Sequence, residues 1–238
     1  MDQLLNMGLG MSMDATYILV AIGAILSMIA SWNVNRAFNK YSNMGNSKGY
    51  TSQQIAQVIL SNAGINDVKI ERISGNLTDH YSPSEKVLRL SDSVYGSTSV
   101  AALGVAAHEC GHAIQHKVGY APIHLRTVAV PIANFGSKLS WPVILIGLAM
   151  GWAGLAQLGV LLFVGVVFFQ VITLPVEFNA SSRALQILEK DNVLVGSELS
   201  AAKSVLTAAA LTYVAAMISS VLQLLRLIMI AKSSSRRR

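Results

Sequence analysis

The chain has 238 residues, of which 53% are hydrophobic and only 13% are charged, and its mean hydropathy is +0.50. This composition excludes an ordinary soluble globular protein and indicates a membrane protein. The formal net charge is +6, but no basic stretch interleaved with aromatic residues accompanies it, so no nucleic-acid partner is expected. A single cysteine, Cys110, excludes an intrachain disulfide.

Four apolar segments are expected to cross a bilayer, because each approaches the roughly 20 apolar residues that the hydrocarbon core requires. The first covers residues 17–32 and follows a start without Lys or Arg, so we expect an anchor rather than a cleaved signal peptide. The other three cover residues 128–150, 155–174 and 205–225. The basic tail at 236–238 is expected to lie beside anionic lipid.

A polar stretch between the first two spans predicts a small α+β unit. Residues 51–65 place apolar side chains at helical spacing behind a Thr-Ser start, which predicts a short amphipathic helix. Residues 67–73 and the stretch KVLRL at 86–90 carry β-compatible side chains and predict strands. The Ala-rich segment Val100–Lys117 contains no proline and predicts a further helix.

These elements predict a mostly α-helical membrane protein with about four transmembrane helices and one small α+β unit. Pro175 is expected to separate the third span from the helix after it. The expected segments are an N-terminal transmembrane anchor (1–35), a soluble α+β unit (36–122), two transmembrane helices (123–175), a helix and loop (176–204), and a C-terminal transmembrane helix with its basic tail (205–238).

The predicted helix Val100–Lys117 contains the pattern HExxH, as His108-Glu109-Cys110-Gly111-His112. Residues four apart lie on one helix face about 5–6 Å from each other, so His108 and His112 can direct two imidazoles at one ion. Glu109 can reach a water in an open coordination position without binding the metal itself. Zn²⁺ lowers the pKa of such a water to about 7, which makes Glu109 the expected general base of a hydrolysis.

Other interpretations of these histidines are weaker. Histidines on a polar helix face without a ligand are one, but a chance HExxH occurs in on the order of one such sequence in a hundred. A di-iron bundle needs a second Glu-x-x-His element, and no other glutamate here has a histidine three residues later. Membrane desaturases use more histidines than the five in this chain. Zinc-dependent hydrolysis is therefore the preferred prediction.

A hydrolytic zinc needs a third protein ligand and keeps a fourth position open. His116 lies about 12 Å along the helix axis from His108, too far to share one ion with it, so we expect it to support the site or to face solvent. Cys110 points away from the face of the two histidines and is expected to pack. Glu177, after the third span, is either the third ligand or a carboxylate that complements a helix dipole behind Pro175.

The stretch HECGHAIQH, with LRLSDSVYGSTSVAALGVA before it and VEFNASSRAL after the third span, resembles the YugP-type family of neutral zinc metallopeptidases over nearly the whole chain. A looser similarity links it to HtpX-like and CAAX-prenyl membrane proteases, in which an E-x-x-x-D helix supplies the third ligand. The resemblance implies Zn²⁺ held by His108, His112 and Glu177, with Ser181 where those relatives have Asp. It also implies a zincin-like unit, in which strand 86–90 would offer a free edge to an extended substrate.

The expected function is that of a membrane-embedded, gluzincin-like zinc endopeptidase, with Glu109 as general base, acting on protein or peptide segments near the membrane. Candidate donors to the developing oxyanion are His80, Tyr81 and Arg183. One alternative is a non-catalytic, metal-stabilised membrane scaffold, which would need four protein ligands. Another is a zinc hydrolase of a lipid or a small amide.

The distribution of basic residues predicts a multi-pass protein of the cell membrane with its site on the cytoplasmic side. Lys and Arg are frequent after the first span and between the third and fourth, and none precedes the first span. The same rule is broken by the tail at 236–238, which four spans would place on the outside. Either the last segment does not cross fully, or the orientation is reversed.

Overall fold

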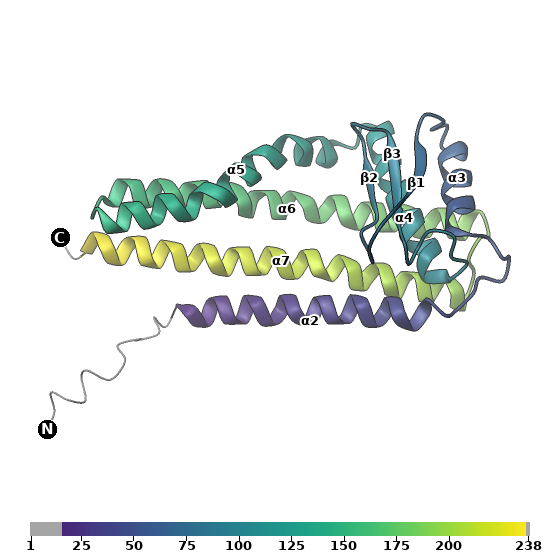
Figure 1. Cartoon of the computed structure of the whole chain (residues 1–238), viewed down its shortest axis with the longest axis horizontal. Helices are drawn as coiled ribbons and strands as arrows, with labels where there is room; N and C mark the ends of the chain where they lie inside the picture. Colours follow the sequence, from purple (N-terminus) through teal and green to yellow (C-terminus); the bar gives the residue numbers. More distant parts are fainter. Residues whose placement is uncertain (1–15, 237–238) are drawn as a thin grey trace, which may run out of the picture.

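The computed structural model describes residues 16–236, and for residues 233–236 it describes the backbone alone. The expectations for residues 1–15 and for Arg237 and Arg238 therefore lie outside the described residues. Four long helices lie side by side, and a smaller unit sits at one end of them (Figure 1). We call the four helices the bundle, and we call the smaller unit of two helices and three strands the head.

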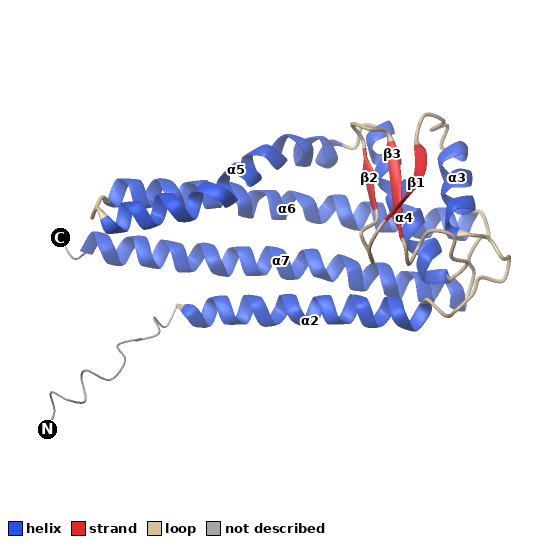
Figure 2. Cartoon of the chain, in the orientation of Figure 1, coloured by secondary structure: helices blue, strands red, loops and turns tan. Residues whose placement is uncertain are grey.

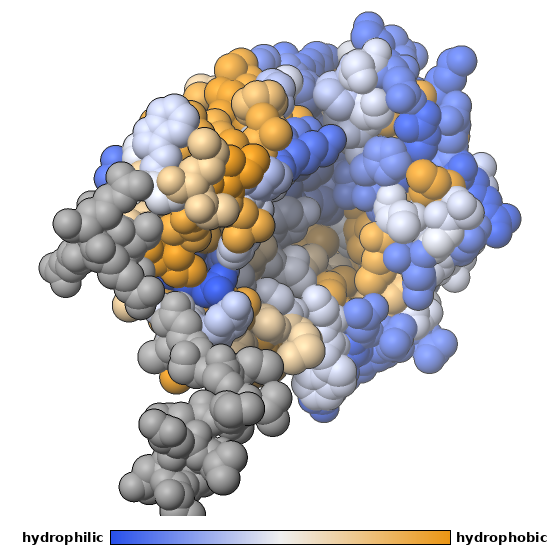
Figure 3. All heavy atoms as spheres, turned by 60° about the vertical axis from the view of Figure 1, so that its left-hand side comes forward, coloured by the Kyte–Doolittle hydropathy of each residue, from blue (hydrophilic) through white to orange (hydrophobic). Residues whose placement is uncertain are grey.

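The bundle contains four helices that are long and apolar enough to cross a bilayer. They are α2 (Tyr17–Tyr41), α5 (Ala121–Ala149), α6 (Ala153–Lys190) and α7 (Ser197–Arg236). In the most apolar window of each helix only 11–28% of the residues are buried, so most apolar side chains face outward, as expected for helices surrounded by lipid. Hydrophobic side chains gather over the bundle and hydrophilic ones over the head, with a hollow between them (Figure 3). The prediction of four apolar spans is confirmed.

The helix α6 runs through Pro175 without a break, so the prediction that Pro175 starts a new helix is wrong. A proline inside a helix removes one hydrogen bond, but neighbouring helices can satisfy the freed groups in a long apolar helix. Glu177 therefore lies in the helix interior and not in a first turn. The explanation of Glu177 as a partner of a helix dipole is excluded with it.

Two of the other bundle helices also differ from their predicted bounds. The helix α7 begins at Ser197 and continues far beyond the predicted span of 205–225. The helix α5 begins at Ala121, with a proline in its first turn, and contains two further prolines. It bends away from α6 toward the head (Figure 1), as helices do at internal prolines.

The bundle encloses one arginine. The side chain of Arg226 on α7 is buried, and its guanidinium lies 4.1 Å from the ring centre of Tyr17 and 5.6 Å from that of Trp141. A charge at this depth is costly, and contact with aromatic faces offsets part of that cost. The arginine thereby links α2, α5 and α7.

The head contains a three-stranded sheet in the order β1-β3-β2 (Figure 2). The strand β1 (Lys69–Ile73) pairs in parallel with β3 (Val87–Ser91), and β2 (His80–Ser82) pairs with β3 in the antiparallel direction. The expectation that residues 86–90 form an edge strand is wrong, because β3 is the central strand. Leu88 and Leu90 point to the same face of this strand and are fully buried in the hydrophobic core that the sheet forms with the two helices of the head. The outer strand that packs against α4 is β2.

The helix α4 (Val100–Lys117) connects the head to the bundle and has the bounds that the sequence predicts. The hydroxyl of Ser99 caps its first turn by accepting a hydrogen bond from the Ala102 amide at 3.2 Å. The helix packs against α3 (Ser52–Asn62) and the sheet, and also against α6 and α7. The HExxH pattern therefore lies at the junction of the two parts.

Gly111 allows α4 to cross α6 at very short range. A Cβ atom at this position would lie 2.7 Å from the carbonyl oxygen of Ala180 on α6 and 3.1 Å from its Cα. Any larger residue would push the two helices apart. This close approach places His108 and His112 opposite Glu177 and its neighbours.

Candidate metal centre

His108 and His112 of α4 meet Glu177 of α6 at the junction of head and bundle. The three ligand atoms lie within 4.8 Å of one another. The Oε2 atom of Glu177 is 3.3 Å from Nε2 of His108 and 3.6 Å from Nε2 of His112. Two ligand atoms at about 2.0–2.1 Å from one tetrahedral zinc ion lie about 3.3–3.5 Å apart. The two distances from Glu177 to the imidazoles are therefore close to those expected around one shared ion.

The environment of Glu177 also fits a metal. Its side chain is buried, and neither carboxylate oxygen accepts a hydrogen bond from the described part of the chain. A buried carboxylate without hydrogen bonds is costly unless a cation compensates its charge. Arg126 of α5 faces the other oxygen, with its Nη1 atom 3.3 Å from Oε1. Arg126 thus compensates the charge at Oε1 and leaves Oε2 free to coordinate an ion through one oxygen.

A chain of hydrogen bonds fixes the orientation of His112. Arg183 donates from Nε to Oδ1 of Asn179 at 2.7 Å, and Gln115 donates from Nε2 to the same oxygen at 3.0 Å and to the Val176 carbonyl at 2.8 Å. The Oε1 atom of Gln115 is therefore an acceptor, 3.0 Å from Nδ1 of His112. Because Nδ1 of His112 must then carry the proton, its Nε2 lone pair is free for a metal.

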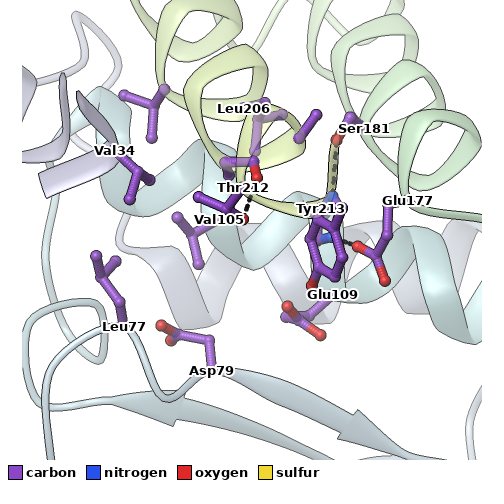
Figure 4. Close-up of a pocket in the computed structure, with 14 residues that line it drawn as sticks. Val34, Leu77, Asp79, Val105, Glu109, Glu177, Ser181, Leu206, Thr212 and Tyr213 are labelled. Atoms are coloured by element: carbon purple, nitrogen blue, oxygen red, sulfur yellow. Dashed lines mark hydrogen bonds and ion pairs between the residues drawn. The ribbon is translucent and has the colours of Figure 1, made fainter. Parts of the chain in front are cut away.

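Ser181 has the same relation to His108. Its Oγ atom lies 3.0 Å from Nδ1 of His108 (Figure 4). A hydroxyl that accepts from Nδ1 leaves Nε2 of His108 directed at the site. Relatives of looser similarity are expected to have a carboxylate here, and a charged acceptor makes the stronger hydrogen bond. The hydroxyl of Ser181 is a neutral acceptor, so its hydrogen bond with His108 is the weaker of the two.

Glu109 faces two adjoining cavities beside the ligand cluster. The first has a volume of about 220 Å³ and is largely apolar, and we call it the apolar cavity. The second, of about 340 Å³, has walls that include His80, His116 and Arg126, and we call it the polar cavity. Glu109 itself is only 7% exposed. Its carboxylate therefore lies at the wall that the two cavities share, next to the proposed ligands but outside their cluster.

Asp79 is a second carboxylate in both cavities. It accepts hydrogen bonds from the Ser91 amide at 2.7 Å and from the Ser91 hydroxyl at 2.8 Å. Burial raises the pKa of Asp79, and these two hydrogen bonds act against the rise. The sequence does not identify Asp79, because a single aspartate in a loop is common.

Of the three predicted oxyanion donors, two line a cavity beside the candidate metal centre and one does not. His80 and Tyr81 line the polar cavity. Arg183 is not among the residues that line either cavity, and its guanidinium lies 6.0 Å from the ring centre of Tyr120. Tyr213, which sequence reasoning missed, lines both cavities from α7, and its ring lies beside Glu109 and Glu177 (Figure 4). One tyrosine within a predicted transmembrane span is only a weak signal.

The remaining candidates of the HExxH helix lie outside the ligand cluster, as predicted. The ring of His116 packs at 5.8 Å from that of Tyr81 and at 6.1 Å from that of His124. Burial and the nearby His124 lower the pKa of His116, so this imidazole is neutral at pH 7. Cys110 is a buried part of the head core, where burial raises the pKa of its thiol.

Comparison with known proteins gives the family of this chain. Residues 16–232 match the family described as "Putative neutral zinc metallopeptidase", and the chain belongs to this family. It is 45% identical over 215 residues to "Putative membrane protease YugP" of Bacillus subtilis (strain 168), which covers 90% of this chain and 96% of that protein. No solved structure matches the chain.

Proposed function

We propose that this protein is a membrane-embedded zinc endopeptidase, with His108, His112 and Glu177 as zinc ligands and Glu109 as general base. The observation that carries the proposal is the convergence of two imidazole nitrogens and one buried carboxylate oxygen within 4.8 Å. The family description and the four apolar helices support the reaction class and the membrane location. The substrates would be protein or peptide segments near the bilayer.

The position of Glu109 supports the proposed proton-transfer role of this residue. Bound zinc would supply a Lewis acid and lower the pKa of water to about 7. The Glu109 carboxylate lies next to the proposed ligands, so it can accept the proton of the attacking water and then donate it to the leaving amine nitrogen. Tyr213, which lines both cavities together with Glu109, is the proposed donor to the charge that develops on the substrate carbonyl.

The donor set supports an enzyme over a metal-stabilised scaffold. Structural zinc sites are closed by four protein ligands, whereas catalytic sites keep one position open. Within residues 16–232, whose side chains the structure describes, the candidate cluster has three members. The two cavities beside it give a substrate access to the fourth position.

The test compares the wild type with Glu109→Gln in purified, detergent-solubilised protein. We expect both proteins to hold about one zinc ion per chain, because Glu109 is not a ligand in this proposal. Casein cleavage by Glu109→Gln should fall about 10²- to 10⁴-fold, the usual loss of a general base. Glu189→Gln, on the exposed end of α6, is the matched control and should leave cleavage unchanged.

Zinc content tests the third ligand separately. Glu177→Ala should lose most of its zinc and its activity together, because two histidines alone hold zinc weakly. Equal cleavage by wild type and Glu109→Gln would remove Glu109 from the mechanism. A wild-type protein that binds no zinc would contradict the whole proposal.

A further inference from the structure

The apolar cavity is formed by elements that are far apart in the sequence. Val34 of α2, Leu77 of the loop before β2, Val105 of α4 and Leu206 of α7 contribute to its wall (Figure 4). Ala209 and Ala210 of α7 add two small side chains, which leave room where a larger residue would fill the space. The cavity therefore depends on the meeting of head and bundle.

The size of the apolar cavity limits what can enter it. Sites that enclose a whole drug-sized ligand have volumes of about 300–1,000 Å³. The apolar cavity has about 220 Å³, which suits one large side chain rather than a lipid chain or a complete small molecule. Its apolar wall favours an aliphatic or aromatic group, since burying such a group stabilises binding by about 0.8 kcal/mol per CH₂.

Two adjoining cavities can receive two neighbouring side chains of an extended peptide. Successive side chains of an extended chain project to opposite sides. The apolar and polar cavities share Asp79, Glu109, Glu177 and Tyr213, so both begin at the candidate metal centre. A peptide bond held there would direct one flanking side chain into each cavity.

We propose that the apolar cavity binds a large apolar side chain, such as that of Leu, Met or Phe, immediately next to the bond that is cleaved. This inference rests on the proposed function of a zinc endopeptidase. It identifies the substrate class as extended segments with a large apolar residue at the cleavage position. Substrates with a large apolar side chain would bind more tightly, because that side chain buries its surface in the cavity, whereas a small one leaves the cavity unfilled.

The test measures binding as well as cleavage. The hydroxamates of Ala, Leu and Phe are suitable probes, because a hydroxamate binds zinc and carries the side chain beside it. Titration calorimetry on the zinc-loaded wild type should show the Leu and Phe compounds binding about 10- to 50-fold more tightly than the Ala compound. Mass spectrometry of casein products should show cleavage next to large apolar residues.

Two variants change the cavity in opposite directions. Ala209→Leu places extra carbons in the cavity and should reduce the preference for Leu over Ala hydroxamate to less than about 3-fold, with zinc content unchanged. Val34→Ala enlarges the same cavity and should raise the affinity for the Phe compound relative to the Leu compound. Ala216→Leu, the same substitution seven residues further along α7 and outside the residues that line the cavity, is the matched control.

The outcomes separate this inference from the proposed function. A wild type that binds zinc and shows the side-chain preference but cleaves no peptide would contradict the peptidase alone. Equal binding of all three hydroxamates to zinc-loaded wild type would overturn the cavity proposal. A preference that persists in Ala209→Leu but disappears in Val130→Phe would also overturn it, because Val130 lines the polar cavity and the side chain would then bind there. A chain without zinc would overturn both.

Discussion

Gln115 controls the orientation of His112, although it lies outside the HExxH pattern. Its amide group donates to Val176 and Asn179 of α6, and its side-chain oxygen faces the His112 ring. Gln115 is fully buried, so no water can replace these contacts without a rearrangement. Gln115 therefore connects His112, one proposed ligand, to α6, the helix that carries the proposed ligand Glu177.

We expect Gln115→Leu to weaken zinc binding about 10- to 100-fold, the usual effect of removing a partner that orients a metal-binding histidine. Leucine has a similar size but leaves the Val176 carbonyl and the His112 Nδ1 proton without their partner. Competition with a zinc chelator in detergent measures the change directly. Gln57→Leu on the exposed side of α3 is the matched control, and an unchanged zinc affinity in Gln115→Leu would show that this hydrogen bond does not position His112.

At the scale of single residues, the sequence predicts the features that depend on spacing within one helix. The spacing of His108 and His112 indicates a shared ion, and the burial of Cys110 follows from its helix face. The contributions of Arg126 and Tyr213 depend on helices that the fold brings to α4 from elsewhere in the chain. No spacing rule connects such distant positions, so a single sequence cannot reveal them.

The crossing of α4 over α6 depends on Gly111. We expect Gly111→Ala to destabilise the protein by about 1–3 kcal/mol, because the added methyl group would overlap the backbone of Ala180 and force the helices apart. The same displacement would move His108 and His112 away from Glu177. Thermal unfolding should therefore shift to lower temperature and zinc affinity should fall in the same variant.

Gly104 on the same helix provides the control for this prediction. A Cβ atom there would lie 3.3 Å from the Cβ of Ala202 and 3.7 Å from its Cα, a tight contact but without the overlap with backbone atoms that Gly111→Ala would create. Gly104→Ala should change stability by less than Gly111→Ala and leave zinc affinity unaltered, because alanine also favours the helix. Equal effects of the two substitutions would show that the α4–α6 crossing is not especially close at Gly111.

At the scale of elements, the errors of sequence reasoning come from tertiary context. Pro175 is a helix breaker by its own chemistry, yet packing keeps α6 continuous. The sequence of the strand Val87–Ser91 does not indicate which strands pair with it. Its central place arises because β3 turns back beside β2 and also pairs with β1. Apolar length, in contrast, is a local property, and it predicts all four long helices.

The length of α6 relates the candidate metal centre to the bilayer. From Ala153 to Glu177 the helix rises by about 36 Å, which is close to the roughly 30 Å of a hydrocarbon core plus part of one interface. The exposed Trp152 at the start of α6 is the kind of residue that marks a membrane surface. If the turn before α6 lies at one surface, the metal centre lies close to the other, where it can reach segments that emerge from the membrane.

The orientation of the whole molecule is predicted by its basic residues. Several Lys and Arg residues lie at the head end of the bundle, whereas the turn between α5 and α6 contains neither. Because Lys and Arg are enriched in short cytoplasmic segments, we expect the head and its site to face the cytoplasm. The basic end of α7 would then lie outside, which makes an experimental test necessary.

Cysteine labelling in intact cells provides this test, because the only native thiol is inaccessible. Cys110 is buried, and its raised pKa keeps the thiolate fraction low at pH 7–8, so the wild type should react little with a membrane-impermeant maleimide. Met150→Cys, at the turn before α6, should be labelled from outside, whereas Asn76→Cys in the head should be labelled only after the cells are permeabilised. The reverse pattern would place the candidate metal centre on the outer face and restrict its substrates to proteins exposed there.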